Sequence, residues 1–371
     1  MTRLASTSAA SRTVLIMAGG TGGHVFPALA AARVLRERGF EPVWLGTERG
    51  LEARLVPPAQ IPMEWISFSG VRGKGLLTWV LAPFRLLRAI GQSIQVIRRR
   101  CPDVVLGAGG FVSGPGGIAA WLLRKPLVIH EQNAVAGMTN RLLAHLATRV
   151  LEAFPNSFSS ATQAQAVGNP VRREIVQLSP PELRFAEHQG PLHLFVMGGS
   201  QGAARLNAVV PAALALLPEA LRPQVIHQAG ERHLQHTSDV YGQHGVIAQV
   251  RAFIDDMAHT YGWADLVVCR AGALTVSELA AAGVGAVFVP FAQAVDDHQT
   301  RNAQFLVQSD AAVLIPETEL TPQRLAQELE KLFSAGRERL LRMARNARAQ
   351  AIVDADVRLA DTCIAVAGGT A

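Results

Sequence analysis

Two glycine-rich turns, about 180 residues apart, most constrain what this chain can fold into. The first, GGTGGH at 19–24, follows the apolar run at 13–18, and the second, GGSQGA at 198–203, follows the apolar run at 192–197. Glycine after a strand lets backbone N–H groups approach a ligand closely. The N-terminus of the following helix carries partial positive charge and unpaired donors, which suit phosphate. One such turn is a weak signal, whereas two in tandem predict two doubly wound domains facing a cleft.

Composition supports two domains. The chain has 371 residues, of which 49% are hydrophobic and 17% charged, so it can bury more than one core. Its net charge of +6 favours an anionic partner: nucleic acid, anionic lipid or a phosphorylated substrate. The three cysteines lack metal-type spacing and predict reduced, cytosolic thiols. We expect no signal peptide in residues 1–11 and no membrane-spanning helix, because no run of about 18 uncharged apolar residues is present.

Apolar runs alternate with helical patterns along the chain, which predicts parallel sheets covered on both faces. In the first half we expect strands at 14–17, 42–45, 104–106, 127–130 and 150–153 and helices at 27–38, 76–99, 117–123 and 137–146. In the second half we expect strands at 192–197, 224–227, 245–249, 266–269, 286–289 and 312–314, a helical stretch at 321–351 and a last helix at 353–367. The predicted domains are 12–168, onto which a helix at about 352–371 packs back, and 169–351.

Glycine-rich and polar motifs follow several predicted strands, and open α/β sheets bind ligands at such strand ends. The loop at 107–117 holds six glycines and predicts an anion-binding nest, with a flexible loop as the alternative. The run HEQN at 130–133 suits sugar hydroxyls and a diphosphate, although Glu131 alone also fits a helix cap. His24 is a candidate general base or hydrogen-bond donor, with a structural cap as the alternative. Val25 stands where a dinucleotide fingerprint needs glycine, which argues against a dehydrogenase.

The second half carries a matching set of motifs. Thr275 and Glu278 fit a capping box, but Glu278 also suits the two hydroxyls of a ribose, with the amides of 271–275 holding a diphosphate. The polar cluster at 296–299 suits a hydroxyl-rich ligand, with a solvated loop as the alternative. A serine hydrolase is a weaker alternative: Ser200 lies in a G-x-S-x-G elbow, and Asp265 and His298 follow in the required order, but this leaves the other motifs unexplained.

One helix has the composition of a membrane-facing surface. Between residues 71 and 100 there are seven basic and no acidic side chains, interleaved with large apolar ones. This pattern is typical of binding to anionic lipid, and an ordinary helix packed on the sheet is the alternative. We expect no nucleic acid here. The expected membrane residues are Leu76, Leu77, Trp79, Phe84, Arg85 and Arg88.

Taken together, these motifs resemble the MurG family of peptidoglycan N-acetylglucosaminyltransferases. They are GGTGGHVFP at 19–27, GGFVSGPGG at 109–117, HEQN at 130–133, GNPVR at 168–172, GGSQGA at 198–203, RAGALTVSE at 270–278 and DHQ at 297–299. The set covers nearly the whole chain in order. The resemblance implies a GT-B fold of two Rossmann-like domains and transfer of GlcNAc from UDP-GlcNAc to the C4 hydroxyl of lipid-linked MurNAc-pentapeptide, with inversion.

The resemblance also implies roles for individual residues. The catalytic candidates are His24, as general base, and Glu131. Donor binding is expected at Thr21, Gly22, Gly23, Asn133, Arg172, Ser200, Phe253, Ile254, Ala273, Leu274, Thr275, Glu278 and Gln299. The acceptor diphosphate is expected at Gly20, Gly22, Gly109, Gly110, Ser113, Gly114 and His130. Thr300 stands where some members carry a second glutamine.

No cofactor or metal is implied. The expected partners are UDP-GlcNAc, the lipid-linked acceptor, the anionic cytoplasmic leaflet of the inner membrane, and proteins of cell-wall synthesis and division. The expected location is peripheral, on the cytoplasmic face of that membrane. Two other functions stay open at this point: a UDP-GlcNAc 2-epimerase, which would need neither a membrane-facing helix nor a second diphosphate site, and a non-catalytic protein that binds a nucleotide sugar.

Overall fold

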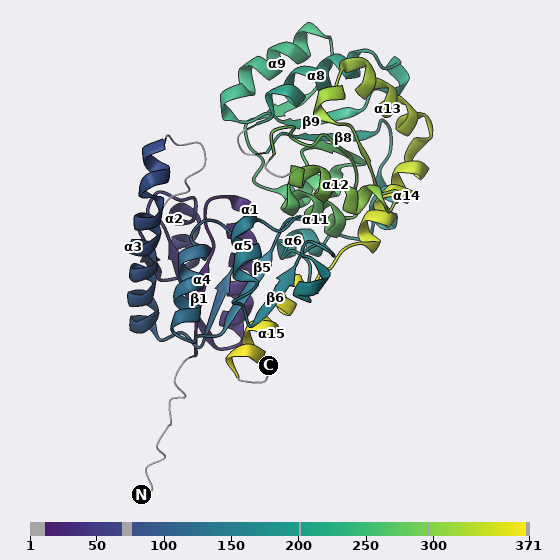
Figure 1. Cartoon of the computed structure of the whole chain (residues 1–371). Helices are drawn as coiled ribbons and strands as arrows, with labels where there is room; N and C mark the ends of the chain where they lie inside the picture. The colour runs from purple at the N-terminus through teal and green to yellow at the C-terminus, as the bar shows by residue number, and fades with distance from the viewer. Residues whose placement is uncertain (1–11, 69–75, 200–201, 295–296, 369–371) are drawn as a thin grey trace, which may run out of the picture. The chain divides into compact units, whose positions relative to one another are not determined.

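The computed structural model describes residues 12–68, 76–199, 202–294 and 297–368 (Figure 1). The strands are β1 (Arg12–Met17), β2 (Phe40–Gly46), β3 (Met63–Trp65), β4 (Val104–Gly107), β5 (Leu127–Glu131), β6 (Arg149–Glu152), β7 (Gln165–Ala166), β8 (His193–Met197), β9 (Gln224–Gln228), β10 (Gln249–Arg251), β11 (Leu266–Cys269), β12 (Gly285–Phe288) and β13 (Ala312–Leu314). The helices are α1 (Gly22–Glu37), α2 (Glu52–Leu55), α3 (Leu76–Arg100), α4 (Ser113–Leu122), α5 (Met138–Leu143), α6 (Arg173–Val176), α7 (Pro181–Glu187), α8 (Ala204–Ala215), α9 (Leu234–Gln243), α10 (Met257–Trp263), α11 (Ala273–Ala282), α12 (His298–Val307), α13 (Pro322–Ser334), α14 (Gly336–Ala349) and α15 (Ala355–Ala367).

The chain forms two compact units, each built on one parallel sheet. The first unit comprises residues 1–132, 136–170 and 354–371, and the second comprises 133–135 and 171–353. The first sheet has the strand order β3-β2-β1-β4-β5-β6-β7 and the second the order β10-β9-β8-β11-β12-β13. Every strand pair in both sheets is parallel. The predicted fold class, two doubly wound α/β domains, is confirmed.

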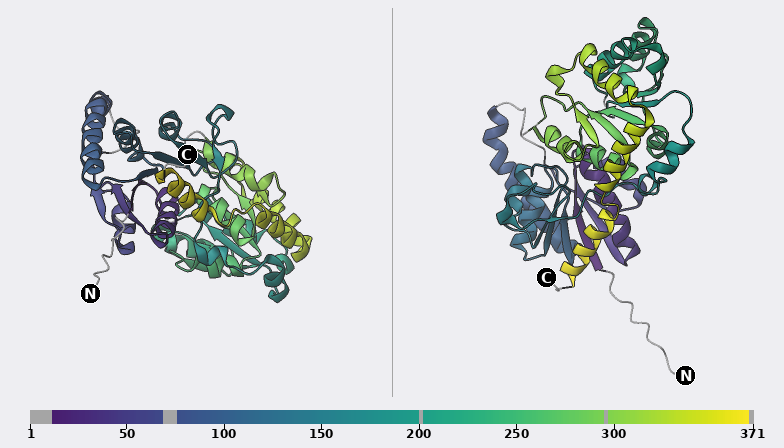
Figure 2. Two further views of the ribbon diagram at one scale, coloured as in Figure 1. Left: turned by 90° about the horizontal axis from the view of Figure 1, so that it is seen from below. Right: turned by 90° about the vertical axis from the view of Figure 1, so that its right-hand side faces the viewer.

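The core of the first unit lies on both faces of its sheet, because successive side chains of a strand point to opposite faces. In β1, Val14 and Ile16 join one apolar cluster, and Leu15 and Met17 join the other. The last helix, α15, packs against α1 and buries side chains such as Leu359 in the first of these clusters (Figure 2). The C-terminal end of the chain thereby covers one face of the N-terminal sheet.

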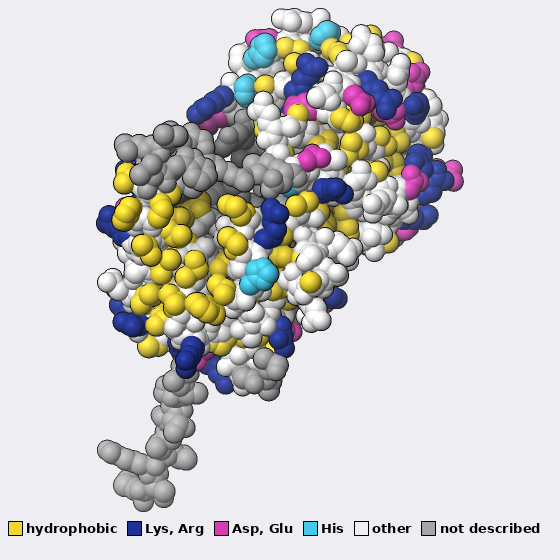
Figure 3. Space-filling model, in the orientation of Figure 1, with side chains coloured by type: hydrophobic (Ala, Val, Ile, Leu, Met, Phe, Trp, Pro, Cys, Tyr) yellow, Lys and Arg dark blue, Asp and Glu magenta, His cyan; other side chains and the backbone are white. Residues whose placement is uncertain are grey.

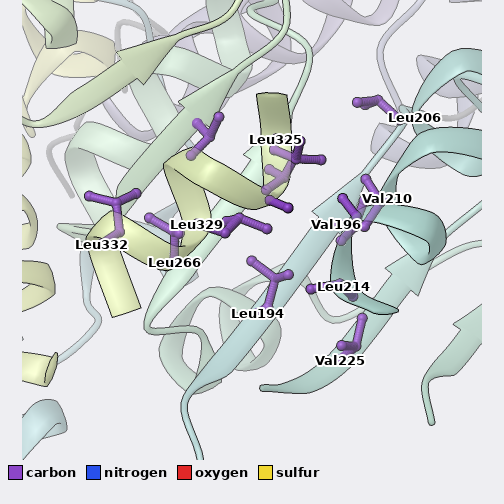
Figure 4. Packing of buried hydrophobic residues seen from close by; sticks show 14 of the residues in the cluster. Leu194, Val196, Leu206, Val210, Leu214, Val225, Leu266, Leu325, Leu329 and Leu332 are labelled. Carbon is purple, nitrogen blue, oxygen red and sulfur yellow. The ribbon is translucent and has the colours of Figure 1, made fainter. Parts of the chain in front are cut away.

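Part of the core of the second unit lies between one face of β8 and the helices α8 and α13. Figure 4 shows Leu194 and Val196 of β8 among leucines and valines of α8 and α13. The α13 residues recur at Leu325, Leu329 and Leu332, three or four positions apart, which places them on one side of a helix. Thr321 caps this helix, since its hydroxyl accepts a hydrogen bond from the backbone N–H of Arg324.

Several expected element boundaries are wrong, mostly where glycines were interpreted as turns. Helix α1 begins at Gly22 rather than at 27, and α4 begins at Ser113 rather than at 117. A Cβ atom on Gly116 would lie 2.1 Å from Sδ of Met17, so this glycine allows α4 to pack closely on the sheet. The expected strand at 245–249 is found at Gln249–Arg251, and the helical stretch at 321–351 is divided at Gly336, whose φ is +67°. The elements α2, β3 and β7 were not predicted.

Candidate active site

The glycine-rich turns lie at the one position in each sheet where doubly wound folds bind ligands. In the first sheet, β2 and β3 follow on one side of β1, whereas β5, β6 and β7 follow on the opposite side, beyond β4, so the strand order reverses between β1 and β4. The turns after these two strands start at Ala18 and Ala108. In the second sheet the same reversal lies between β8 and β11, and the turns after them start at Gly198 and Arg270. Ligands of open α/β sheets bind outside the strand ends at such a switch point. Each unit therefore has one candidate binding site.

In the first unit the two glycine turns pack directly against each other. A Cβ atom on Gly110 would lie 2.2 Å from the carbonyl oxygen of Gly19, and a Cβ on Gly109 would lie 2.4 Å from Cδ2 of His24. Both Gly109 (φ +87°) and Gly110 (φ +80°) also have a left-handed backbone that favours glycine. These glycines therefore bring the second turn against His24, at the start of α1.

His24 has a partner that orients its ring. Its Nδ1 lies 3.0 Å from the hydroxyl oxygen of Thr21, the residue that precedes α1. When Nδ1 carries the ring proton and donates it to this hydroxyl, the lone pair of Nε2 can accept a proton. The arrangement thus suits a general base. The backbone N–H groups of Gly22 and Gly23 belong to the first turn of α1, where a helix offers them no carbonyl partner.

The first three residues of the HEQN run, His130, Glu131 and Gln132, are buried, and their side chains bond to the neighbouring backbone. His130 is fully buried, and this burial lowers its pKa to about 4, so the ring is neutral near pH 7. Its Nε2–H donates to the carbonyl oxygen of Gly168 at 2.9 Å. Gln132 donates from Nε2 to the carbonyl of Ala108, at the entrance to the second glycine turn, at 2.7 Å. Glu131 accepts from the backbone N–H of Gly137, at the N-terminus of α5, at 3.1 Å.

The carboxylate of Glu278 is the centre of the candidate site in the second unit. Arg172 donates to its Oε1 from Nη2 at 2.9 Å and from Nε at 3.2 Å, and the hydroxyl of Tyr261 donates to its Oε2 at 3.2 Å. Burial raises the pKa of Glu278, although Arg172 opposes this rise. Burial also raises the pKa of Tyr261, which keeps its hydroxyl protonated as a donor.

These contacts correct the capping-box interpretation of Glu278. Helix α11 begins at Ala273 with Gly272 as its N-cap, so Thr275 lies inside the first turn and caps nothing. Glu278 instead holds Arg172, which comes from a segment 106 residues earlier. Tyr261 was not singled out from the sequence, because a tyrosine within a short helix gives no signal of its partner.

Of the other expected donor residues, Thr21, Gly22 and Gly23 lie in the first unit at the start of α1, whereas the following ones belong to the second unit. Phe253 follows β10 and is 56% exposed, whereas Ile254 beside it is buried. Ala273, Leu274 and Thr275 form the first turn of α11, where backbone N–H groups are available to an anion. The side chain of Gln299 accepts the backbone N–H of Phe291 at 2.9 Å. Ser200 lies outside the described residues.

A buried asparagine that the sequence did not point to connects two of these segments. Asn302 of α12 is fully buried and donates from Nδ2 to the carbonyl oxygen of Ala271, after β11, at 3.2 Å. It donates also to Oδ1 of Asn133 at 3.4 Å, and its own Oδ1 accepts from the backbone N–H of Ala134 at 2.8 Å. Asn133 is thereby attached to the second unit, next to the turn at 270–272.

The serine hydrolase alternative is wrong. Asp265 precedes β11, and β11 pairs in register with β8 from Leu266 beside Leu194 to Cys269 beside Met197. The motif at 198–202 begins after Met197, the last residue of β8, which lies roughly 13 Å along the strands from the level of Asp265. The carboxylate of Asp265 bonds instead to His188 at 2.6 Å and to Arg337 at 3.3 Å.

The same cluster contains a set of potential metal ligands: His188, His193 and Asp265 lie within reach of one ion. Both oxygens of Asp265 already have partners, since Oδ2 accepts the backbone N–H of His193 at 2.9 Å. Nδ1 of His193 bonds to the carbonyl of Trp263, and its ring stacks on that indole. A guanidinium beside the carboxylate opposes a cation, so we interpret the cluster as a polar contact that joins the starts of β8 and β11.

An apolar surface lies on the helices of one face of the first unit. Helix α4 packs between α3 and α5, and apolar side chains gather over this face (Figure 3). The exposed members are Leu81, Phe84, Leu87, Trp121, Leu122, Met138 and Leu142. Arg85 and Arg88 are exposed on the same helix as Phe84, whereas the side chains of Leu76, Leu77 and Trp79 lie outside the described part of the structure. Among the described residues, no helix combines the length and apolarity needed to cross a bilayer.

Comparison with known proteins identifies the family. The glycosyltransferase family 28 N-terminal domain matches residues 14–152, and the glycosyltransferase family 28 C-terminal domain matches residues 193–359. A Nitrosococcus oceani protein named UDP-N-acetylglucosamine--N-acetylmuramyl-(pentapeptide) pyrophosphoryl-undecaprenol N-acetylglucosamine transferase is 59% identical over 356 residues, 96% of this chain and 99% of that protein. A protein of the same name from Marinobacter nauticus is 56% identical over 363 residues, 98% of this chain and 100% of that protein.

Solved structures agree with the sequence relatives. The crystal structure of Acinetobacter baumannii MurG superposes with a TM-score of 0.84 at 42% identity, over 95% of this chain and 99% of that one. The calicheamicin glycosyltransferase CalG4 superposes with a TM-score of 0.67 at 17% identity, over 98% of this chain and 100% of that one, which shows a shared fold alone. The predicted GT-B fold and the resemblance to the MurG family are confirmed. The chain belongs to glycosyltransferase family 28 and, within it, to the MurG family of N-acetylglucosaminyltransferases.

Proposed function

We propose that this protein transfers GlcNAc from UDP-GlcNAc to the C4 hydroxyl of MurNAc in undecaprenyl-diphosphate-MurNAc-pentapeptide, with inversion at the anomeric carbon. The observation that carries the proposal is the pair of glycine turns at the switch point of each sheet, in a chain whose relatives at 59% and 56% identity are named for this reaction. These names also favour the transferase over the epimerase and the non-catalytic binding protein.

In the proposed reaction the second unit holds the donor. The carboxylate of Glu278 accepts hydrogen bonds from the two ribose hydroxyls, and Arg172, whose side chain is 43% exposed, turns toward the diphosphate. Backbone N–H groups in the first turns of α8 and α11 bind the same diphosphate. The hydroxyl of Ser200 is a further proposed donor to it. The side chains of Gln299 and Asn133 contact the GlcNAc hydroxyls.

The first unit holds the acceptor and the base. Nε2 of His24 takes the proton of the C4 hydroxyl while Nδ1–H donates to Thr21. The C4 oxygen then bonds to C1 of GlcNAc from the face opposite UDP, the bond from C1 to the phosphate oxygen breaks, and UDP leaves with the electron pair. Helix N-termini stabilise the charge that develops on UDP. We assign Glu131 to positioning rather than to proton transfer, because it caps Gly137 and accepts from Asn140 at 2.8 Å.

We further propose that the apolar face over α3, α4 and α5 binds the anionic cytoplasmic leaflet, where the lipid-linked acceptor resides. Exposed Phe84 and Leu87 would enter the acyl boundary, while Arg85 and Arg88 meet lipid phosphates. Proteins of cell-wall synthesis and division that act at this membrane are the proposed protein partners of the same face.

The reaction is tested by measuring UDP release from UDP-GlcNAc with and without a short-chain lipid-diphosphate-MurNAc-peptide. We expect release only with the acceptor, together with a new disaccharide product. The His24→Ala variant is expected to lower kcat by about 10²–10⁴ and to leave UDP affinity unchanged. Acceptor-independent release of UDP with free ManNAc would assign an epimerase, and donor binding without turnover would assign a binding protein.

A further inference from the structure

A buried carboxylate, which the sequence did not single out, accepts a hydrogen bond from the backbone of the first glycine turn. Glu52, the first residue of α2, is fully buried. Its Oε2 accepts the backbone N–H of Gly20 at 3.1 Å. Its Oε1 accepts the backbone N–H of Thr47 at 3.0 Å and the hydroxyl of Thr47 at 2.9 Å. All of these residues belong to the first unit.

Glycines around this carboxylate make room for it. A Cβ on Gly19 would lie 2.8 Å from Oε1 of Glu52, and a Cβ on Gly50 would lie 2.1 Å from both oxygens. A Cβ on Gly46 would lie 2.8 Å from Cγ of the same side chain. A second buried side chain fixes the residue before the turn, since Nε1–H of Trp44 donates to the carbonyl of Ala18 at 2.9 Å. Side chains from β2 and α2 thus anchor the chain at Ala18 and at Gly20, on either side of Gly19.

This anchoring changes the interpretation of Gly20. Its N–H donates a hydrogen bond to the carboxylate of Glu52, and a negative charge next to an anion-binding turn repels the anion. Glu52 therefore does not bind the diphosphate. It fixes the conformation of the turn that leads into α1, and the other face of that turn is in contact with Gly110 through the carbonyl of Gly19.

We propose that Glu52 is a positioning residue for the lipid-linked acceptor. It acts through Gly20, whose placement sets the start of α1 and the position of His24 against Gly109. The proposal rests on the proposed function, because it concerns the acceptor site of that reaction. Loss of the carboxylate would let the turn move, and both the acceptor-binding N–H groups of α1 and the base would move with it. The donor site of the second unit contains none of these residues.

The test compares Glu52→Gln with Glu64→Gln. Glu64 is a matched control: it is a buried glutamate of the first unit, paired with Arg99 and Arg100, and no hydrogen bond joins it to the turn. For Glu52→Gln we expect the KM of a short-chain acceptor to rise at least about tenfold, with the KM of UDP-GlcNAc within about twofold of the wild type. For Glu64→Gln we expect both KM values within about twofold of the wild type.

A purely structural role for Glu52 predicts a different result. Fewer folded molecules would lower kcat and leave both KM values unchanged, and this outcome would overturn the proposal. An equal rise in both KM values would overturn it as well. Should Glu52→Gln not fold, Thr47→Val removes one hydrogen bond to the same carboxylate, and we expect its acceptor KM to rise about two- to fivefold. An unchanged acceptor KM in that variant would count against the proposal. Failure of the proposed function is distinguishable, because the wild type would then show no acceptor-dependent UDP release.

Discussion

Arg172 places Nη2 2.9 Å from Oε1 of Glu278, so the carboxylate proposed to bind ribose already carries a guanidinium in the structure. The other oxygen, Oε2, accepts the hydroxyl of Tyr261. Tyr261 is fully buried and has little freedom to leave, whereas the side chain of Arg172 is 43% exposed. We therefore expect donor binding to exchange the arginine for ribose hydroxyls and to keep the tyrosine in place.

The first prediction concerns Glu278→Gln. The amide keeps the shape of the side chain, but one of its two oxygens is replaced by an NH₂ group, which cannot accept a hydrogen bond. It also lacks the negative charge that strengthens the hydrogen bonds to Glu278. We expect the KM of UDP-GlcNAc to rise about 10–100-fold, with the acceptor KM unchanged. Steady-state kinetics with each substrate varied in turn measures this. A matched rise in the acceptor KM would contradict the assignment of Glu278 to the donor.

The second prediction concerns the pH dependence of donor affinity. Burial raises the pKa of Glu278 above its ordinary value of 4.5, and the ionised form is the one that accepts ribose hydroxyls. The affinity for the donor is therefore at its full value above this raised pKa and is lost as the pH falls through it. The loss begins at a higher pH than it would with a glutamate of ordinary pKa. Calorimetric titration with UDP-GlcNAc between about pH 8 and about pH 5 tests this. The Glu278→Gln variant should bind UDP-GlcNAc more weakly, with an affinity that does not change over this pH range. The same pH dependence in the variant and the wild type would refute the prediction.

The third prediction concerns stability at acid pH. Burial lowers the pKa of His130 from 6.5 to about 4, so below pH 6.5 the unfolded chain takes up a proton that the folded chain does not. Stability is therefore complete above 6.5 and falls as the pH drops from 6.5 toward 4, by up to roughly 3 kcal/mol. Buried His227, with its pKa lowered to about 3, acts in the same direction.

The measurement is the unfolding midpoint in urea across this pH range. His130→Gln should weaken the pH dependence of the midpoint, whatever it does to stability at neutral pH. His145→Gln, a change at an exposed histidine of the same unit, is the control and should leave the dependence as in the wild type. Identical pH dependence in all three proteins would show that His130 is not the group responsible.

The sheets were predictable from the sequence because their strands are continuous apolar runs. The run at 266–269 is buried along its whole length, and it and the run at 312–314 are found at the expected residues. The helix starts were not, since the sequence cannot show that a glycine such as Gly116 is required by packing against Met17 rather than by a turn. Short edge elements such as β3 depend on pairing with β2 and leave no periodic pattern of their own.

The motifs that contact substrate are conspicuous in the sequence, and the side chains that hold them are not. Glu278 stands in a motif, but Tyr261 and Asn302, which bond to it or to the neighbouring turn, lie in ordinary helices. Glu52 is 32 residues from the turn that it anchors. Such partners are brought together by tertiary structure, so only coordinates reveal them. Coordinates were also needed for Glu131, because the sequence left open whether it contacts the substrate or caps a helix.

The fourth prediction concerns Gly110→Ala. A Cβ here would lie 2.2 Å from the carbonyl oxygen of Gly19, and the residue has a φ of +80°, which side chains disfavour. We expect the first unit to lose roughly 2–4 kcal/mol of stability. Gly114→Ala is the control, because the nearest atom, Cγ2 of Thr139, is 3.6 Å away and the site is helical. Thermal unfolding monitors both, and an equal Tm shift for the two variants would argue against the contact between the turns.

The fifth prediction concerns the apolar face of the first unit. Phe84 is 70% exposed and Leu87 is 65% exposed on α3, beside two exposed arginines. Inserting these two side chains into a membrane is worth about 1.5–3 kcal/mol each, so Phe84→Glu with Leu87→Glu should lower binding to phosphatidylglycerol vesicles at least about tenfold. Turnover of a short-chain, water-soluble acceptor should not change, because neither residue belongs to the candidate site. Ile247→Glu alters an even more exposed apolar residue of the second unit, 93% exposed, and should leave vesicle binding intact. Equal vesicle binding by the α3 double variant and the wild type would exclude this face as the membrane contact.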